Sequence, residues 1–288
     1  MTIPKLNHYS LPRAAELAPN RVDWQLDPQR TALLIHDVQH YFISFYGTDN
    51  PLVQTMIENI QRIKAYCYQH DIPVYYTAQP IKQGRNERGL LLDMWGAGLQ
   101  DPSQQPIVDA LAPTKQDIVL TKWRYSAFQK CDFEAQLKAQ QRDQLLIVGI
   151  YGHIGVMTTA IDAFMRDIQP FVVADAIADF TKDEHMMALH IIGQRAGKVI
   201  TTAEVIGEAS INLTTLAGLK AFILPLIDCE PDEFDEHESL IDYGLDSVQV
   251  MNLISLWQQQ GIETNFIELA QMPTLAAWVE LIESRMAE

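Results

Sequence analysis

The feature that most constrains this chain is an alternation of short, continuous apolar segments with longer amphipathic segments, which runs to about residue 205. Continuous apolar runs are typical of strands buried on both faces, and helices between such strands form the crossovers of a parallel sheet. Helices are expected over about 51–70 and 157–165. We therefore predict an α/β fold, a doubly wound parallel sheet with right-handed crossovers. Its expected strands are 31–37, 72–79, 117–122, 144–151, 170–179 and 198–206.

The pattern changes after Val205. A small, polar stretch at 206–215 indicates a linker, so we expect a first domain over 1–207, a linker over 208–215 and a second domain over 216–288. All segments of the second domain have helical patterns, with Gly261 and Thr274 as expected end and start signals. Together they predict a C-terminal four-helix bundle. Its expected helices are 216–227, 248–260, 266–270 and 275–283.

Charge is concentrated in the second domain. Residues 216–288 hold 14 acidic residues against two basic ones, a net charge of −12 out of −16 for the whole chain. Because no basic stripe is present to bind phosphates, nucleic-acid binding is not expected, and the acidic domain is expected to meet basic partner surfaces. No apolar run has a membrane-spanning length and no secretory signal is visible, so we expect a soluble, cytoplasmic protein without membrane contact.

Polar side chains stand at the ends of four expected strands. Asp37 ends the first strand, Gln79 the second, Lys122 the third and Tyr151 the fourth. Ligands of open α/β sheets bind beyond the carboxyl ends of the strands. Each residue alone is consistent with an ordinary polar group at a strand end, but the four together predict a site. His36 is expected on the face of its strand opposite Asp37, because neighbouring side chains alternate.

Two loops border this edge. Residues 81–99 include Arg88, Trp95 and several glycines, and they are either an exposed charged loop or a lid that brings a guanidinium to a carboxylate substrate. The turn at 152–155 lies between a strand and a helix, where many α/β hydrolases expose a nucleophile. Here the turn contains no serine or cysteine.

Six longer stretches are distinctive: LLIHDVQHYF (33–42), YYTAQP (75–80), LDMWGAGL (92–99), TKWRYSAF (121–128), GIYGHIG (149–155) and DAFMRDIQPFVVADAIADF (162–180). Together they closely resemble the isochorismatase family, within the cysteine-hydrolase-like superfamily. In that wider superfamily an Asp, a Lys and a Cys form the catalytic triad, and the matching positions here are Asp37, Lys122 and Gly155. A glycine at the third position is a known property of the isochorismatase branch.

This resemblance implies hydrolysis of the vinyl ether of isochorismate to 2,3-dihydro-2,3-dihydroxybenzoate and pyruvate. Asp37 would be the general acid that protonates the terminal carbon, and water would add without a covalent intermediate or a metal. A neighbouring Lys⁺ lowers the pKa of an Asp, whereas burial and substrate carboxylates raise it, and the sequence leaves that balance open. The other implied roles are pairing with Asp37 for Lys122, water positioning for Gln79, carboxylate binding for Arg88, pocket walls for Trp95 and Tyr151, and space beside the substrate for Gly155.

The second domain contains SLIDYGLDSVQVMNLI over 239–254. From its residues alone, a serine after an aspartate at a helix start is more often a simple cap. The stretch resembles the attachment motif of acyl and peptidyl carrier proteins, which implies that Ser247 carries 4′-phosphopantetheine. The phosphate would then lie near a helix N-terminus, which favours anions.

The two domains together resemble the bifunctional isochorismatase and aryl carrier proteins of catechol siderophore pathways, of the enterobactin or vibriobactin type. The resemblance implies a homodimer and three kinds of partner: a phosphopantetheinyl transferase, a 2,3-dihydroxybenzoate–AMP ligase and the condensation domain of a nonribosomal synthetase. Two alternatives are a cysteine hydrolase such as a nicotinamidase, and a non-catalytic carrier or scaffold with a degenerate hydrolase domain. The first needs a thiol at the turn, and Cys67, Cys131 and Cys229 lie elsewhere, without disulfide or metal spacing.

Overall fold

A computed structural model describes residues 3–207, 213–227, 229, 233–259 and 262–286 of the chain. The chain divides into two compact units, Met1–Gly207 and Glu208–Glu288. Residues 208–212 of the expected linker and Gly261, the expected helix end, lie outside the described residues. Each unit has its own hydrophobic core, and each is described separately below.

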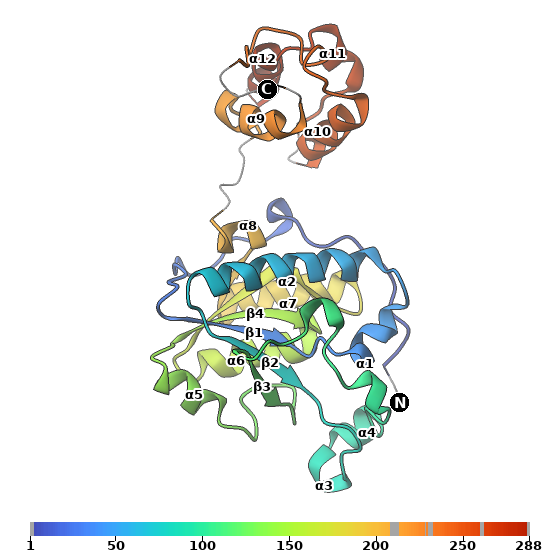
Figure 1. Ribbon diagram of the computed structural model, residues 1–288, viewed down its shortest axis with the longest axis vertical. Helices are drawn as coiled ribbons and strands as arrows, with labels where there is room; N and C mark the ends of the chain where they lie inside the picture. Colours follow the sequence, from blue (N-terminus) through green and yellow to red (C-terminus); the bar gives the residue numbers. More distant parts are fainter. Residues whose placement is uncertain (1–2, 208–212, 228, 230–232, 260–261, 287–288) are drawn as a thin grey trace. The chain divides into compact units, whose positions relative to one another are not determined.

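The first unit is built on a six-stranded parallel sheet with the strand order β3-β2-β1-β4-β5-β6 (Figure 1). In this order, β2 and β3 lie on one side of β1, and β4, β5 and β6 lie on the other side. The predicted doubly wound fold is therefore confirmed. All residues of β1 and β4, the two central strands, are buried, as their continuous apolar sequences require. The strands are β1 (Thr31–His36), β2 (Val74–Ala78), β3 (Ile118–Thr121), β4 (Gln144–Ile150), β5 (Gln169–Ala178) and β6 (Lys198–Ile200).

Helices cover both faces of this sheet. One core layer packs α2 (Pro51–Gln69) and α8 (Thr202–Val205) against the sheet, and the other packs α5 (Phe133–Ala139), α6 (Met157–Phe164) and α7 (Lys182–Arg195). The α2 helix starts where its sequence indicates, because the Asn50 side chain accepts a hydrogen bond from Leu52 N and Pro51 occupies the first helical position.

The expected strand over 198–206 is wrong in its second half. β6 ends at Ile200, and α8 follows at once. Thr201 and Glu204 form a capping box, in which the Thr201 side chain accepts from Glu204 N and the Glu204 carboxylate accepts from Thr201 N. This local hydrogen bonding turns the chain from strand to helix despite its apolar, β-branched sequence.

The second unit is helical. Its core surrounds two buried indoles, since Trp257 Nε1 donates to Leu213 O and Trp278 Nε1 donates to Leu269 O. The first helix ends earlier than expected, and a 3₁₀ turn over Leu224–Leu226 follows it, because Pro225 has no backbone N–H. The helices are α9 (Leu216–Ile223), α10 (Ser247–Gln259), α11 (Phe266–Gln271) and α12 (Leu275–Met286). Across the described parts of both units, no helix combines the length and apolar character needed to cross a membrane.

Candidate active site

Asp37 stands at the carboxyl end of β1, where its backbone adopts a left-handed conformation with φ of 52°. Three hydrogen bonds hold it. Its N–H donates to Thr77 Oγ1 at 3.0 Å, the Thr77 hydroxyl donates to Asp37 Oδ1 at 2.6 Å, and Lys122 Nζ donates to Asp37 Oδ2 at 2.8 Å. Asp37 is 6% exposed and Lys122 is 3% exposed. The ends of β1, β2 and β3 therefore build a buried ion pair.

The pKa of Asp37 reflects two opposing effects. Burial raises it, but the Lys122 ammonium and the hydrogen bonds from Lys122 and Thr77 outweigh burial and hold the pKa below its ordinary value. In the protein without substrate, Asp37 is therefore a carboxylate at neutral pH. The protonation state of Asp37, which the sequence leaves open, is thereby assigned for the site without substrate.

Gln79 and Arg88 come together beside this pair. The Gln79 backbone is held on both sides by the Gln39 side chain, which accepts from Gln79 N at 2.8 Å and donates to Gln79 O at 3.0 Å. Arg88 Nη1 donates to Gln79 Oε1 at 3.2 Å, and Arg88 Nε donates to Gly96 O at 2.8 Å. With 4% of its surface exposed, Arg88 is a pocket residue, and the interpretation of its segment as an exposed loop is wrong at this position.

The segment that carries Arg88 consists of two short helices, α3 (Arg85–Arg88) and α4 (Leu91–Trp95). The turn after α4 passes closely over the guanidinium. Gly98 has φ of 70°, and a Cβ at this residue would lie 2.4 Å from Arg88 Cζ. Glycine is required there for both its backbone conformation and its lack of a side chain.

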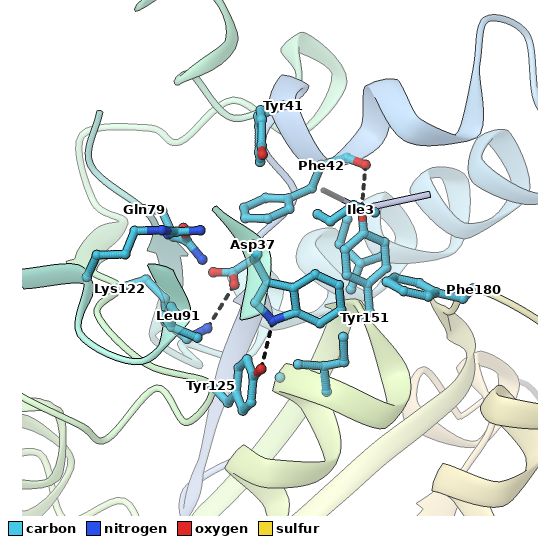
Figure 2. A pocket seen from close by; sticks show the side chains of 15 residues that line it. Ile3, Asp37, Tyr41, Phe42, Gln79, Leu91, Lys122, Tyr125, Tyr151 and Phe180 are labelled. Atoms are coloured by element: carbon cyan, nitrogen blue, oxygen red, sulfur yellow. Dashed lines mark hydrogen bonds and ion pairs between the residues drawn. The ribbon is translucent and has the colours of Figure 1, made fainter. Parts of the chain in front are cut away.

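Aromatic side chains form the walls of the cavity (Figure 2). Trp95 Nε1 donates to Tyr125 Oη at 2.7 Å, and the Tyr151 hydroxyl donates to Phe42 O at 2.7 Å. Tyr151 therefore offers its ring rather than its hydroxyl to the cavity. The cavity and the open solvent at its mouth together contain about 550 Å³ of space free of protein atoms. Its lining includes every residue expected in the first domain's site: Asp37, Gln79, Arg88, Trp95, Lys122, Tyr151 and Gly155.

The lining also contains residues that the sequence analysis did not assign to the site, chiefly Tyr41, Phe42, Tyr125 and Phe180. Three of them had a signal in the sequence, because Tyr41 and Phe42 follow Asp37 closely and Tyr125 follows Lys122. Phe180 comes after the end of β5, a strand edge that we did not consider. Ile3 also lines the cavity, and no local sequence pattern indicates that the N-terminal segment reaches it.

The expectation for His36 is wrong. Its Nδ1 lies 3.6 Å from Asp37 Oδ2, and its fully buried ring packs against Gly155. Side chains alternate only while the backbone stays extended, and the left-handed conformation of Asp37 ends that alternation. Gly155 has a second reason to be a glycine, besides the expected space for the substrate. A Cβ at Gly155 would lie 2.2 Å from His36 Cε1, so the ring occupies the volume next to the glycine.

His153, Asp179 and Glu184 are the one group in the described chain whose atoms lie close enough together to suggest a metal site. Both carboxylate oxygens of Asp179 already have protein partners. Its Oδ2 accepts from His153 N, and its Oδ1 accepts from Phe180 N and pairs with His153 Nδ1. We interpret this group as a clamp between the turn after β4 and the end of β5. The three cysteines lie outside the cavity lining.

In the second unit, Ser247 begins α10 and is exposed. The capping role belongs to its neighbour, because Asp246 Oδ1 accepts from Gln249 N at 2.8 Å and Asp246 N donates to Gln249 Oε1 at 2.8 Å. The Ser247 hydroxyl is therefore not needed for the cap. An exposed hydroxyl at the N-terminus of a 13-residue helix fits covalent attachment of a phosphate-linked arm.

Comparison with protein families accounts for both units. The model of the isochorismatase domain matches residues 31–204. The chain belongs to the isochorismatase family. A second model, that of the phosphopantetheine attachment site, matches residues 217–282 of this isochorismatase. The cofactor of the second unit is therefore 4′-phosphopantetheine.

Some similar proteins match this chain over nearly the whole of both sequences. This isochorismatase is 51% identical to enterobactin synthase component B of Escherichia coli over 98% of both chains. It is 39% identical to an isochorismatase of Bacillus subtilis, covering 99% of this chain and 96% of that one. Among solved structures, a cysteine hydrolase from Pseudomonas syringae has a TM-score of 0.60 and 23% identity, covering 66% of this chain and 97% of that chain, which shows the shared fold.

Proposed function

We propose that this chain hydrolyses isochorismate to 2,3-dihydro-2,3-dihydroxybenzoate and pyruvate by acid catalysis at Asp37, without a covalent intermediate. The observation that carries this proposal is the buried hydrogen bond from Lys122 Nζ to Asp37 Oδ2, in a cavity that none of the three cysteines lines. A carboxyl paired with a proton-bearing amine supports proton transfer, and a site without a thiol supports direct attack by water.

In the proposed reaction, the Asp37 carboxyl gives a proton to the terminal methylene carbon of the vinyl ether. The ether carbon becomes an oxocarbenium ion, to which water adds with loss of a proton. The hemiketal then breaks its bond to the ring oxygen, which takes up a proton as pyruvate leaves. Atoms balance with one water consumed, and a positioned general acid contributes roughly 10²–10⁴ in rate.

Asp37 must be protonated in the complex although it is ionised in the free site. The substrate brings two carboxylates into the cavity, and like charges nearby raise the pKa of a carboxyl. Lys122 Nζ, which holds the ionised carboxylate through a hydrogen bond of 2.8 Å to Asp37 Oδ2, lines the same cavity. We propose that Asp37 takes up a proton when the substrate binds, because the substrate carboxylates draw the Lys122 ammonium away from it and repel its own negative charge.

The other residues bind and orient the substrate in this proposal. Arg88 pairs with a substrate carboxylate through the guanidinium N–H groups that do not bind Gly96 and Gln79. Arg is suited to this because it can bind a carboxylate in a bidentate manner. Gln79 holds the attacking water, and Trp95 and Tyr151 enclose the ring. Gly155 keeps the floor of the cavity free of a side chain.

The test is the Asp37→Asn variant in a coupled assay for pyruvate. We expect at least about a 100-fold loss of kcat, because asparagine cannot deliver the proton. The matched control is Asp143→Asn, which removes an aspartate that is also ion-paired, with Arg30 Nε at 2.8 Å, just before β4 at the opposite end of the strands. Normal turnover in Asp37→Asn would remove the mechanism, and a wild-type chain without pyruvate release would favour the non-catalytic scaffold.

For the second unit, we propose that Ser247 carries the phosphopantetheine arm and that the arm carries 2,3-dihydroxybenzoate as a thioester for siderophore assembly. The similarity to enterobactin synthase component B supports this, since that protein is named as part of a synthase. The proposed partners are a phosphopantetheinyl transferase, a 2,3-dihydroxybenzoate–AMP ligase and a nonribosomal condensation domain. The acidic surface of the unit favours docking to basic partner surfaces, and a homodimer through the first unit is proposed from the family resemblance.

A further inference from the structure

His36 is fully buried behind the candidate active site, and no role in the proposed reaction has been given to it so far. A Cβ at Gly155 would lie 2.2 Å from its Cε1, 2.9 Å from Nε2 and 3.0 Å from Nδ1. All three distances are 3.0 Å or less, and Cβ atoms in proteins almost never come closer than 3.0 Å to another heavy atom. The glycine at position 155 is therefore required by the ring of His36, whatever the substrate needs.

Hydrogen bonds to two groups prevent the ring from moving aside. Its Nδ1 lies 2.8 Å from Ile150 O, and its Nε2 lies 3.3 Å from Thr159 Oγ1. Because a carbonyl can only accept, Nδ1 carries the proton, and Nε2 accepts from the Thr159 hydroxyl. Burial and the nearby Lys122 lower the pKa of His36 to about 4, so the ring is neutral at neutral pH. Both nitrogens thus hold the ring at a fixed angle.

The same ring touches the catalytic carboxylate. His36 Nδ1 lies 3.6 Å from Asp37 Oδ2, the oxygen that accepts the hydrogen bond from Lys122 Nζ. The ring therefore stands between Gly155 on one side and Asp37 Oδ2 on the other. Any side chain at position 155 would push the ring, and the ring would displace Asp37 Oδ2.

We propose that His36 is a positioning residue that holds Asp37 in place and, by filling the volume next to Gly155, prevents the turn after β4 from accepting a nucleophilic side chain. This inference rests on the proposed role of Asp37 as the acid. It assigns the absence of a nucleophile to a steric contact between two residues of this chain. Together, His36 and Gly155 thereby restrict the cavity to reactions without a covalent intermediate.

A double-mutant cycle tests the contact, with pyruvate release as the readout. Gly155→Ala alone is expected to lower kcat about 100-fold with little change in KM, since it displaces the general acid and not the substrate-binding groups. His36→Asn removes Cε1 and Nε2, the two ring atoms closest to the added methyl group, and keeps an N–H donor near the place of Nδ1. His36→Asn should therefore retain more activity than His36→Ala.

The decisive measurement is the double variant His36→Asn with Gly155→Ala. We expect its kcat to return to that of His36→Asn alone, because the alanine methyl group then has room, and contacting residues show such non-additive effects. The matched control is Gly152→Ala, whose Cβ would lie 2.7 Å from Asp179 Oδ2, and His36→Asn should not rescue it. Thermal unfolding of each variant shows that the first unit is folded.

The outcomes separate this inference from the proposed function. If Gly155→Ala costs the same factor with and without His36→Asn, the methyl group acts on the substrate or the turn, and the proposal for His36 is wrong. If Asp37→Asn is inactive in the same assay, that result leaves the proposed function intact. If Asp37→Asn is active, the proposed mechanism itself fails, whatever the cycle gives.

Discussion

At the scale of single residues, the site is predictable where chain order and parallel topology act together. Asp37, Gln79 and Lys122 each follow a strand, so the sheet alone brings them to one edge. The position of His36 could not be predicted, because it depends on the φ of 52° at Asp37. The charge state of Asp37 could not be predicted from the sequence either, since it depends on the 2.8 Å distance between Lys122 Nζ and Asp37 Oδ2.

Replacing Lys122 by Met should give a pH-dependent loss of stability. Removal of one partner of a buried ion pair costs about 3–5 kcal/mol of unfolding free energy at pH 7. Lys122 lowers the pKa of Asp37, so the stability that ionised Asp37 adds is present above its unfolded pKa and is lost as pH falls through the folded pKa. In the variant, burial instead raises the pKa of Asp37 in the folded state, so the penalty is relieved as pH falls.

The difference in unfolding free energy between wild type and Lys122→Met should therefore narrow as pH decreases from 7 toward about 4. Urea unfolding at a series of pH values measures it. The control is Lys138→Met, whose side chain is 68% exposed and pairs with Glu134, and which should cost less than about 1 kcal/mol at every pH. A difference for Lys122→Met that widens toward low pH would contradict the assignment of the Asp37 charge.

At the scale of elements, the strands were easier to predict than the segments between them. Continuous apolar runs identify β1 and β4 without ambiguity, whereas over 198–206 a short apolar pattern fits a strand and a helix equally well. The capping box of Thr201 and Glu204 was present in the sequence and would have indicated the start of α8. The division of 81–99 into α3 and α4 has no comparable signal, because the segment is organised around the buried Arg88 rather than by its own periodicity.

The segment that contains α3 and α4 gives a prediction for Arg88. Arg88→Lys should raise KM for isochorismate at least about tenfold with a smaller effect on kcat, because a hydrogen bond to a charged group contributes about 1.5–3 kcal/mol and lysine cannot form the planar fork. Steady-state kinetics of pyruvate release measure both constants. Arg85→Lys, an exposed change on the same helix, serves as the control and should leave KM unchanged. Equal KM values for the two variants would exclude substrate binding by Arg88.

At the scale of the whole molecule, two separate cores correspond to two separate chemistries. The change from alternating strands and helices to helices alone, and the charge of −12 in residues 216–288, were visible in the sequence. The family models for the isochorismatase domain and the phosphopantetheine attachment site match the two parts separately. What the sequence could not decide is that Asp246 rather than Ser247 caps α10, because both residue types are good caps.

Because each unit has its own chemistry, a substitution in one unit should leave the activity of the other unit unchanged. Ser247→Ala should lose all attachment of phosphopantetheine from coenzyme A in the presence of a transferase, as measured by intact mass, because alanine has no hydroxyl to accept the phosphate. Its rate of pyruvate release should equal that of wild type. Ser255→Ala, an exposed change on the same helix, is the matched control and should still be loaded. A mass gain in Ser247→Ala would show that another residue carries the arm.

The contact between His36 and Gly155 also bears on how a fold of this kind changes its chemistry over evolutionary time. A single codon change that places a cysteine at position 155 puts its Cβ against the imidazole before the new thiol has any benefit. The intermediate sequence would have lost the old reaction without gaining the new one. By the same contact, a smaller residue at position 36 would make room for a side chain at position 155.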